Sequence, residues 1–252
     1  MLPKNKLVYG SNVESSAARS YRSNIQPQNG TGTYNPGDTI TINIPTRNNL
    51  VLVPEESVLK FTVNYKNGSD TAQVIRFDSC GGHGLIERIR VWHGSNLLED
   101  ITTYGVLAKL MFDLQVPTDA CYGKHSITTG TRSDLVVRIP TITAANLATT
   151  NYFTDLGIPV NQINSGARIS GDAATLAAST VVSSTLTLNL ISLVGSLGSA
   201  RYFPLFACTS APLRVEITLA STHLATACIS KDLDATTPMT ITNCEYIGQF
   251  IE

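Results

Sequence analysis

The chain has 252 residues, a formal net charge of -1 and 42% hydrophobic residues, enough for one large domain or two small ones with a full core. No stretch approaches the ~18 consecutive apolar residues of a membrane-spanning helix, and the N-terminus lacks the apolar region of a signal peptide. The five cysteines are widely spaced and form no CxxC pair, so we expect reduced thiols in a protein made inside a cell.

The charged fraction is low. Only 15% of the residues are charged, against about 25% in ordinary globular domains. Charge is depleted in the cores of protein interfaces, so this composition suits a protein that packs against copies of itself. A Thr-rich β protein with no such role would have the same composition.

Residues 1–33 have the composition of an N-terminal arm. The segment is rich in Ser and Asn, and its basic residues outnumber its one acid: Lys4, Lys6, Arg19 and Arg22 against Glu14. One interpretation is a frayed terminus. The other is an arm that orders against a neighbouring subunit or against an acidic inner surface such as packaged nucleic acid.

Most of the remaining chain has the period of β-strands. Apolar and polar residues alternate, or short β-branched runs end at Pro or Gly, in a series of segments. The predicted strands are 39–44, 59–65, 74–77, 86–92, 135–139, 186–193, 213–219 and 239–251. Between them, residues 141–180 are mostly Ala, Thr, Asn, Gly and Ser, which predicts a long loop of the kind that is often functional.

One helix is predicted, at 101–116. Apolar residues recur every three or four positions and mark one helix face, namely Ile101, Tyr104, Leu107, Leu110, Met111 and Leu114. Asp100 is the expected N-cap, and Glu99 beside it is expected to favour the positive end of the helix. Pro117 ends the pattern.

These elements predict an all-β fold. About eight strands, long loops and one inserted amphipathic helix indicate a jelly-roll β-sandwich, in which two facing sheets share a core. We expect it to occupy residues 34–252 as one domain after the arm.

No motif in the chain demands catalysis. Cys80 and His83 lie in a Gly-rich loop, but a thiolate nucleophile also needs an orienting third group, and no family signature surrounds the pair. The loop precedes a strand rather than a helix, so it is not a phosphate-binding loop. Gly195 and Gly198 have the wrong spacing for a GxSxG elbow. We therefore expect no catalytic residue and no enzyme activity.

Metal, cofactor and sugar sites are likewise not predicted. The four histidines lack the close spacing of metal ligands, and no cluster of acids joins them: His83, His93, His125 and His223. Adjacent acids such as Glu99 and Asp100 point different ways in the chain and do not form an acid/base pair. Trp92 and the tyrosines could form a sugar-stacking platform, although single aromatics on sandwiches are more often core or interface residues.

Several motifs together resemble the first half of double jelly-roll major capsid proteins, the lineage of tailless icosahedral phages, virophages, polinton-like viruses and adenoviruses. They are Tyr34-Asn-Pro-Gly-Asp-Thr-Ile-Thr-Ile-Asn-Ile-Pro, Ser57-Val-Leu-Lys-Phe, Leu85-Ile-Glu-Arg-Ile-Arg-Val, Leu97-Leu-Glu-Asp-Ile with Tyr104, Arg201-Tyr-Phe-Pro-Leu and Pro212-Leu-Arg-Val-Glu-Ile-Thr-Leu. Their order and spacing match from about residue 24 to 252. Each motif alone is loose, and the series is more specific.

The resemblance implies a structural virion protein that self-assembles into trimeric, pseudo-hexagonal capsomers of an icosahedral shell. The implied partners are copies of itself and minor capsid or penton proteins, and the arm at 1–33 would contact an inner membrane or the genome. A second jelly roll follows the first in this family. The sequence is therefore either part of a longer chain with two jelly rolls or a relative that has a single jelly roll. The alternatives from other classes are a carbohydrate-binding sandwich (a lectin or adhesin module) and a jelly-roll enzyme.

Overall fold

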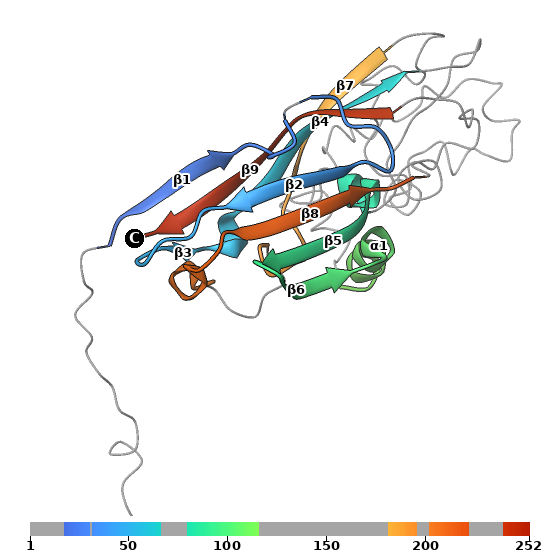
Figure 1. Cartoon of the computed structure of the whole chain (residues 1–252). Helices are drawn as coiled ribbons and strands as arrows, with labels where there is room; N and C mark the ends of the chain where they lie inside the picture. Colours follow the sequence, from blue (N-terminus) through green and yellow to red (C-terminus); the bar gives the residue numbers. More distant parts are fainter. Residues whose placement is uncertain (1–17, 31, 67–79, 116–180, 196–201, 222–238) are drawn as a thin grey trace, which may run out of the picture.

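The structure, a computed structural model, describes residues 18–30, 32–66, 80–115, 181–195, 202–221 and 239–252. Two antiparallel sheets, named A and B below, face each other and enclose one core, and a helix lies at one end of sheet B (Figure 1). This architecture confirms the predicted jelly-roll β-sandwich with one inserted helix. No helix in the described ranges has the length and apolar character needed to cross a membrane.

Sheet A has the strand order β1-β9-β4-β7. Its strands are β1 (Ser20–Ile25), β9 (Met239–Ile251), β4 (Val58–Lys66) and β7 (Val181–Leu188), and the short β3 (Val51–Leu52) also pairs with β9. The predicted strands at 59–65 and 239–251 correspond to β4 and β9. β1 lies inside the segment expected to be an arm: Ser20 pairs with Ile251 and Ile25 pairs with Tyr246, so these six residues form part of the sheet.

Sheet B has the strand order β2-β8-β5-β6. Its strands are β2 (Thr39–Ile44), β8 (Leu213–Leu219), β5 (Ile86–His93) and β6 (Asn96–Ile101). β2, β8 and β5 confirm the strands predicted at 39–44, 213–219 and 86–92. Consecutive partners in space are far apart in sequence, as in β2 against β8, which is the connectivity of a jelly roll rather than of a simple meander.

Strict alternation explains why these segments are strands. In β2 and β8 every second side chain is buried, and their inward sets meet across the ladder, with Ile42 opposite Val215 and Ile40 opposite Ile217. A register slip of one residue would turn all of these side chains to solvent, so the pattern fixes the register. Each buried aliphatic side chain contributes roughly 1.5–3 kcal/mol by leaving water.

The helix, α1, spans Tyr104–Gln115 and packs against a short 3-10 helix, η3 (Gly81–Leu85). The close approach requires Gly105, because a Cβ there would lie 3.1 Å from the carbonyl oxygen of Ile86 and 3.3 Å from the Cα of Gly84. Two further 3-10 helices, η2 (Pro54–Glu56) and η4 (Leu205–Cys208), lie in connections.

The predicted helix start was wrong. Asp100 is not an N-cap: it lies in β6, paired with Arg90 across the ladder, and β6 continues to Ile101. Its carboxylate instead forms a two-point ion pair with the guanidinium of Arg88. The strand persists because Ile101 pairs with Ile89 and packs against the core.

The strand predicted at 186–193 was displaced by five residues, since β7 spans Val181–Leu188. β7 ends at Leu188, and residues 189–195 then leave the sheet as a buried segment, here named the closing segment. Gly195 ends it in a tight turn, where a Cβ would lie 1.8 Å from the carbonyl oxygen of Leu190. The predicted strands at 74–77 and 135–139 and the loop at 141–180 lie outside the described residues.

Candidate functional site: the closing segment, the charged face and the apolar margin

The closing segment links the two sheets through side chains rather than through a strand ladder. Glu99 on β6 accepts hydrogen bonds from the hydroxyl of Ser192 and from the backbone N–H of Leu193, the latter at 3.0 Å. From sheet A, the hydroxyl of Tyr246 donates to the carbonyl oxygen of Val194 at 2.7 Å. Glu99 therefore fastens the segment to β6 and does not act on the helix as expected.

A buried polar network continues from the closing segment to η3. The hydroxyl oxygen of Tyr104 accepts the backbone N–H of Ile191 at 2.9 Å and lies 2.8 Å from Nδ1 of His83. One buried hydrogen bond therefore joins the Tyr104 hydroxyl to the His83 imidazole. Burial raises the pKa of Tyr104 above its ordinary value, which keeps its hydroxyl protonated.

Cys80 and His83, the sequence candidates for a nucleophile and base, both lie in this interior. Their side chains are 1% and 0% exposed, and the backbone N–H of His83 donates to the carbonyl oxygen of Cys80 at 3.2 Å. The imidazole also packs against Phe112 of α1, with 5.2 Å between ring centroids. The geometry assigns His83 to holding η3 against α1.

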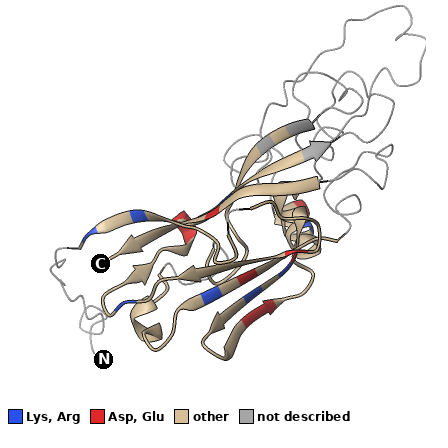
Figure 2. Ribbon diagram, turned by 45° about the horizontal axis from the view of Figure 1, so that its top comes forward, with Lys and Arg blue, Asp and Glu red and all other residues tan. Residues whose placement is uncertain are grey.

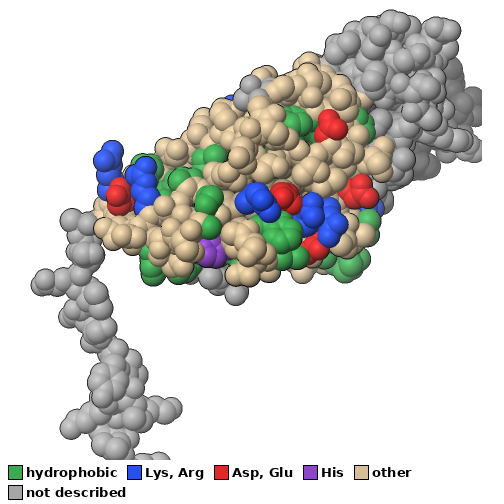
Figure 3. Space-filling model, viewed as in Figure 1, with side chains coloured by type: hydrophobic (Ala, Val, Ile, Leu, Met, Phe, Trp, Pro, Cys, Tyr) green, Lys and Arg blue, Asp and Glu red, His purple; other side chains and the backbone are tan. Residues whose placement is uncertain are grey.

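The outer face of sheet B carries a compact charged cluster. The carboxylate of Glu216 accepts the indole N–H of Trp92 at 3.0 Å and pairs with the guanidinium groups of Arg90 at 3.0 Å and Arg214 at 3.2 Å. Both guanidinium groups also lie near the indole ring, 5.9 and 5.4 Å from its centroid. Figures 2 and 3 show these opposite charges side by side on the strands of sheet B.

Trp92 therefore does not form an open sugar-stacking platform. Its N–H is occupied by Glu216, and a guanidinium group lies near the ring from each of two strands. The neighbouring Arg88–Asp100 pair, at 2.6 Å, extends the cluster to β6 and holds the pKa of Asp100 below its ordinary value through the Arg88 hydrogen bond. Three guanidinium groups thus contact two carboxylates within the sheet, which suits a structural role.

Large apolar side chains are exposed along another side of the molecule. Those most exposed in the described residues come from three stretches, β6, α1 and the segment 202–208 that contains η4: Leu97, Leu98, Val106, Leu110, Leu114, Tyr202 and Phe206. These stretches follow one side of the sandwich in Figure 1, and we name this side the apolar margin.

Two residues of this margin were wrongly predicted to be buried. Leu110 and Leu114 were predicted on the buried helix face, but they are 56% and 75% exposed, while Tyr104 and Ala108 face the core. Val106 was not singled out at all. The signal was available: Val106, Leu110 and Leu114 recur every four residues and form a second apolar stripe beside the first.

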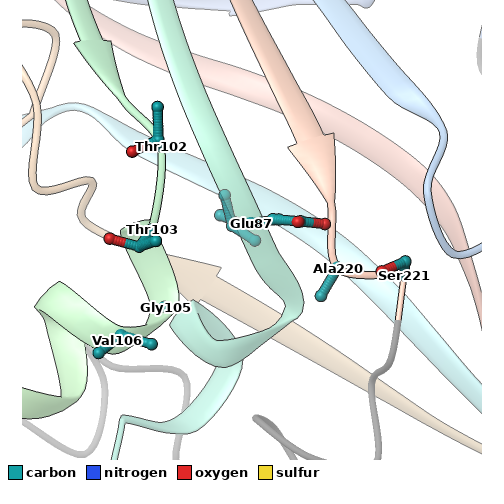
Figure 4. A pocket seen from close by; sticks show the side chains of 8 residues that line it. Glu87, Thr102, Thr103, Gly105, Val106, Ala220 and Ser221 are labelled. Carbon is teal, nitrogen blue, oxygen red and sulfur yellow. The ribbon is translucent and has the colours of Figure 1, made fainter.

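A hollow of about 170 Å³ lies at the α1 end of the margin. Its lining is mostly apolar and includes Val106, Gly105, Ile86 and Ala220, with Glu87 and Thr103 at its sides (Figure 4). The hollow is large enough for an apolar side chain and lacks a convergent set of polar groups in its lining.

The histidines do not come together where the structure describes them. His83 is buried, whereas His93 lies 3.2 Å from the hydroxyl of Ser210 at the far end of β5. No three His, Cys, Asp or Glu side chains gather within the described ranges in a way that would hold a metal ion. His125 and His223 lie outside those ranges.

Comparison with known proteins gave matches only at the level of structure. No family model matches the chain, and no curated protein matches it in sequence. Among solved structures, a chain of the Sputnik virophage, determined by cryo-EM, is 11% identical with a TM-score of 0.52, and the match covers 100% of this chain and 52% of that chain. The mavirus major capsid protein is 14% identical with a TM-score of 0.44, covering 100% and 51%. The Faustovirus major capsid protein is 10% identical with a TM-score of 0.43, covering 97% and 56%.

The chain spans about half the length of the solved chains it matches. At 11% identity, the Sputnik match establishes the fold and nothing more specific. It agrees with the two facing sheets and single helix seen directly in the structure. The chain thus has a jelly-roll fold, and this fold also forms about half of a chain in the Sputnik particle.

Proposed function

We propose that this chain is a structural virion protein, the major capsid protein of an icosahedral virus. The observation that carries the proposal is the match of the whole chain to a chain from the Sputnik virophage particle. The motif series that resembles double jelly-roll capsid proteins, from about residue 24 to 252, supports the proposal independently of the structure. The protein would act by assembly rather than by turnover.

The physical basis for assembly is a rigid wall with exposed contact surfaces. The two sheets share one continuous core, so the sandwich resists deformation when it packs. The low charge of the chain and the exposed apolar side chains of the margin favour association, because covering apolar surface removes it from water and lowers the free energy. Closed symmetry repeats each contact many times, so modest contacts suffice for a shell.

The proposal extends to the assembly and its partners. Copies of this chain would form trimeric, pseudo-hexameric capsomers that contact minor capsid or penton proteins. The residues before the jelly-roll domain would face an inner membrane or the genome. A second jelly roll in a longer parent chain is supported by the 52% coverage of the Sputnik chain. The protein would be made in the host cell and located in the virion.

Mass measurement tests this function directly. The polypeptide should be isolated from its native source, its intact mass determined, and its assemblies weighed by native mass spectrometry and viewed by electron microscopy. We expect trimers and shells, built from chains of about twice this length. A native chain that stays monomeric at high concentration, without particles, would refute the capsid role.

A further inference from the structure

The helix α1 presents apolar side chains on two sides. Tyr104 and Ala108 are buried against the core, whereas Val106, Leu110 and Leu114 are 60%, 56% and 75% exposed. Residues four apart lie on one stripe of a helix, so the three exposed side chains form a continuous ridge. A helix that is apolar on opposite sides is typically covered on both.

The ridge has little charge beside it that would repel an apolar partner. Lys109 and Asp113 form an i,i+4 ion pair at 3.3 Å along the same helix. On β6, the carboxylate of Glu99 is turned to the closing segment and that of Asp100 to Arg88. These four charges are therefore matched within the molecule, and Glu87, which is exposed at the side of the hollow, is the acid that faces the margin without an ion pair among the described residues.

The exposed apolar area has the size of an interface. Aromatic side chains bury roughly 150–250 Å² each when fully covered, and with five aliphatic residues beside two aromatic ones, each 44–75% exposed, the three stretches together offer on the order of 700 Å². One partner in a standard stable interface contributes about 800 Å².

The opposite edge of sheet B, at β2, is partly covered by residues 28 and 29. Asn29 acts there like a short strand: its amide donates to the carbonyl oxygen of Thr39 at 2.7 Å, and its side-chain oxygen accepts the N–H of Thr41 at 3.1 Å. The N–H of Gln28 donates to the carbonyl oxygen of Thr41 as well. At the other edge, β6 pairs with β5 alone among the described strands. Among the described residues, the β2 edge is thus covered at Thr39 and Thr41, and β6 is the outermost strand at the other edge.

We propose that the apolar margin is the surface through which one copy of this chain packs against a second copy. The proposal rests on the proposed function, since a shell built from copies of one chain needs such a contact. A neutral apolar ridge on α1 fits the apolar surface of another copy, and the hollow beside Val106 accepts one of that copy's side chains.

Cross-linking tests the surface without destabilising the fold. A benzophenone amino acid is placed at position 110 of the full chain, and its matched control at position 62 on the outer face of sheet A, where Thr62 faces Thr185. After irradiation, we expect covalent dimers from position 110 and at most traces from position 62. Capture of the same chain only would show that a segment of this chain covers the ridge, and would overturn the proposal.

A charge on the ridge tests its contribution. Leu110→Glu is compared with Thr62→Glu by native mass spectrometry across a concentration series. Covering a Leu side chain favours association roughly tenfold or more, so we expect Leu110→Glu to weaken association at least tenfold with an unchanged melting temperature. Unchanged association would overturn the proposal.

The outcomes separate this surface from the function. If the unmodified chain forms oligomers or shells but position 110 neither cross-links to another copy nor affects association, the margin is not the contact and the capsid role stands. If the unmodified chain forms no oligomer at any concentration, both the margin contact and the capsid role fail. If Leu110→Glu does not fold, the cross-linking result at position 110 decides.

Discussion

The hydroxyl oxygen of Tyr104 accepts the backbone N–H of Ile191 at 2.9 Å, across 87 residues of sequence. This contact ties α1 to the closing segment, because Ile191 lies at the centre of that segment and has no strand partner in a ladder. The same hydroxyl lies 2.8 Å from His83 of η3. One buried side chain thus satisfies polar groups from two distant parts of the chain.

Tyr104→Phe should therefore destabilise the fold while leaving its shape intact. The ring remains, but the N–H of Ile191 and Nδ1 of His83 each lose a partner in the interior. A buried polar group without a partner costs about 1–3 kcal/mol, so we expect a loss in this range in the free energy of unfolding. Urea denaturation followed by circular dichroism measures this free energy.

Tyr202→Phe, at a 55% exposed tyrosine, is the control and should change stability by under about 0.5 kcal/mol.

Gly105→Ala should also destabilise the fold, although the helix propensities of glycine and alanine predict the opposite. Alanine favours a helix over glycine by about 1 kcal/mol, which alone predicts a gain. However, the new Cβ would lie 3.1 Å from the oxygen of Ile86 and 3.3 Å from the Cα of Gly84, and backbone atoms cannot move aside cheaply. We expect a lower melting temperature as α1 shifts away from η3. Val106→Ala, one residue along and 60% exposed, is the control without the clash; a rise in melting temperature for Gly105→Ala would show that the contact is not tight.

The strands were predictable because their signal is local. β2, β8 and β9 alternate in the sequence with the period of their burial, and no distant information is needed to recognise them. β1 was missed because its inward side chains are only partly buried and its sequence is polar, so its place in the sheet depends on the ladder with β9. A polar edge strand has no signature of its own.

The contacts around the closing segment were not predictable because they join distant residues. Asp100 has the chemistry of an N-cap, and only the position of Arg88 on the neighbouring strand shows that its carboxylate is used elsewhere. Glu99 likewise acts on residues 192 and 193. The alternation at Leu186, Leu188 and Leu190 continues past the end of β7 because the closing segment is buried as well, so hydrophobicity could not mark the boundary.

Glu216→Gln should lower the free energy of unfolding by weakening the charged cluster on the outer face of sheet B. It removes the carboxylate charge that contacts two guanidinium groups, those of Arg90 and Arg214. Because the pairs are partly exposed, we expect a loss of only about 1 kcal/mol, smaller at high salt. The fluorescence of Trp92, the single tryptophan of the chain, should also change, since its indole N–H donates to this carboxylate at 3.0 Å.

Glu55→Gln is the matched control for that substitution. Glu55 lies in η2 with an exposed side chain, far in sequence from the cluster on β5 and β8. We expect neither the stability nor the tryptophan emission to change. Identical emission from Glu216→Gln and the unmodified protein would contradict the contact between Trp92 and Glu216.

Burial of Cys244 predicts a loss of stability at alkaline pH. Desolvation raises the pKa of this thiol from 9.0 to about 12, with a smaller contribution from the charge of Glu245. Between these values the unfolded chain has lost the proton that the folded chain still binds, so folding becomes less favourable as the pH rises from about 9 towards 12. One such group contributes a slope of up to about 1.4 kcal/mol per pH unit. Denaturation measured between pH 8 and 11, in steps of about one pH unit, gives this slope, and Cys244→Ala should reduce it, whatever the alanine does to stability at neutral pH. Cys208→Ala, at a partly exposed thiol, should reduce it less, and equal slopes in all three proteins would show that Cys244 is not desolvated.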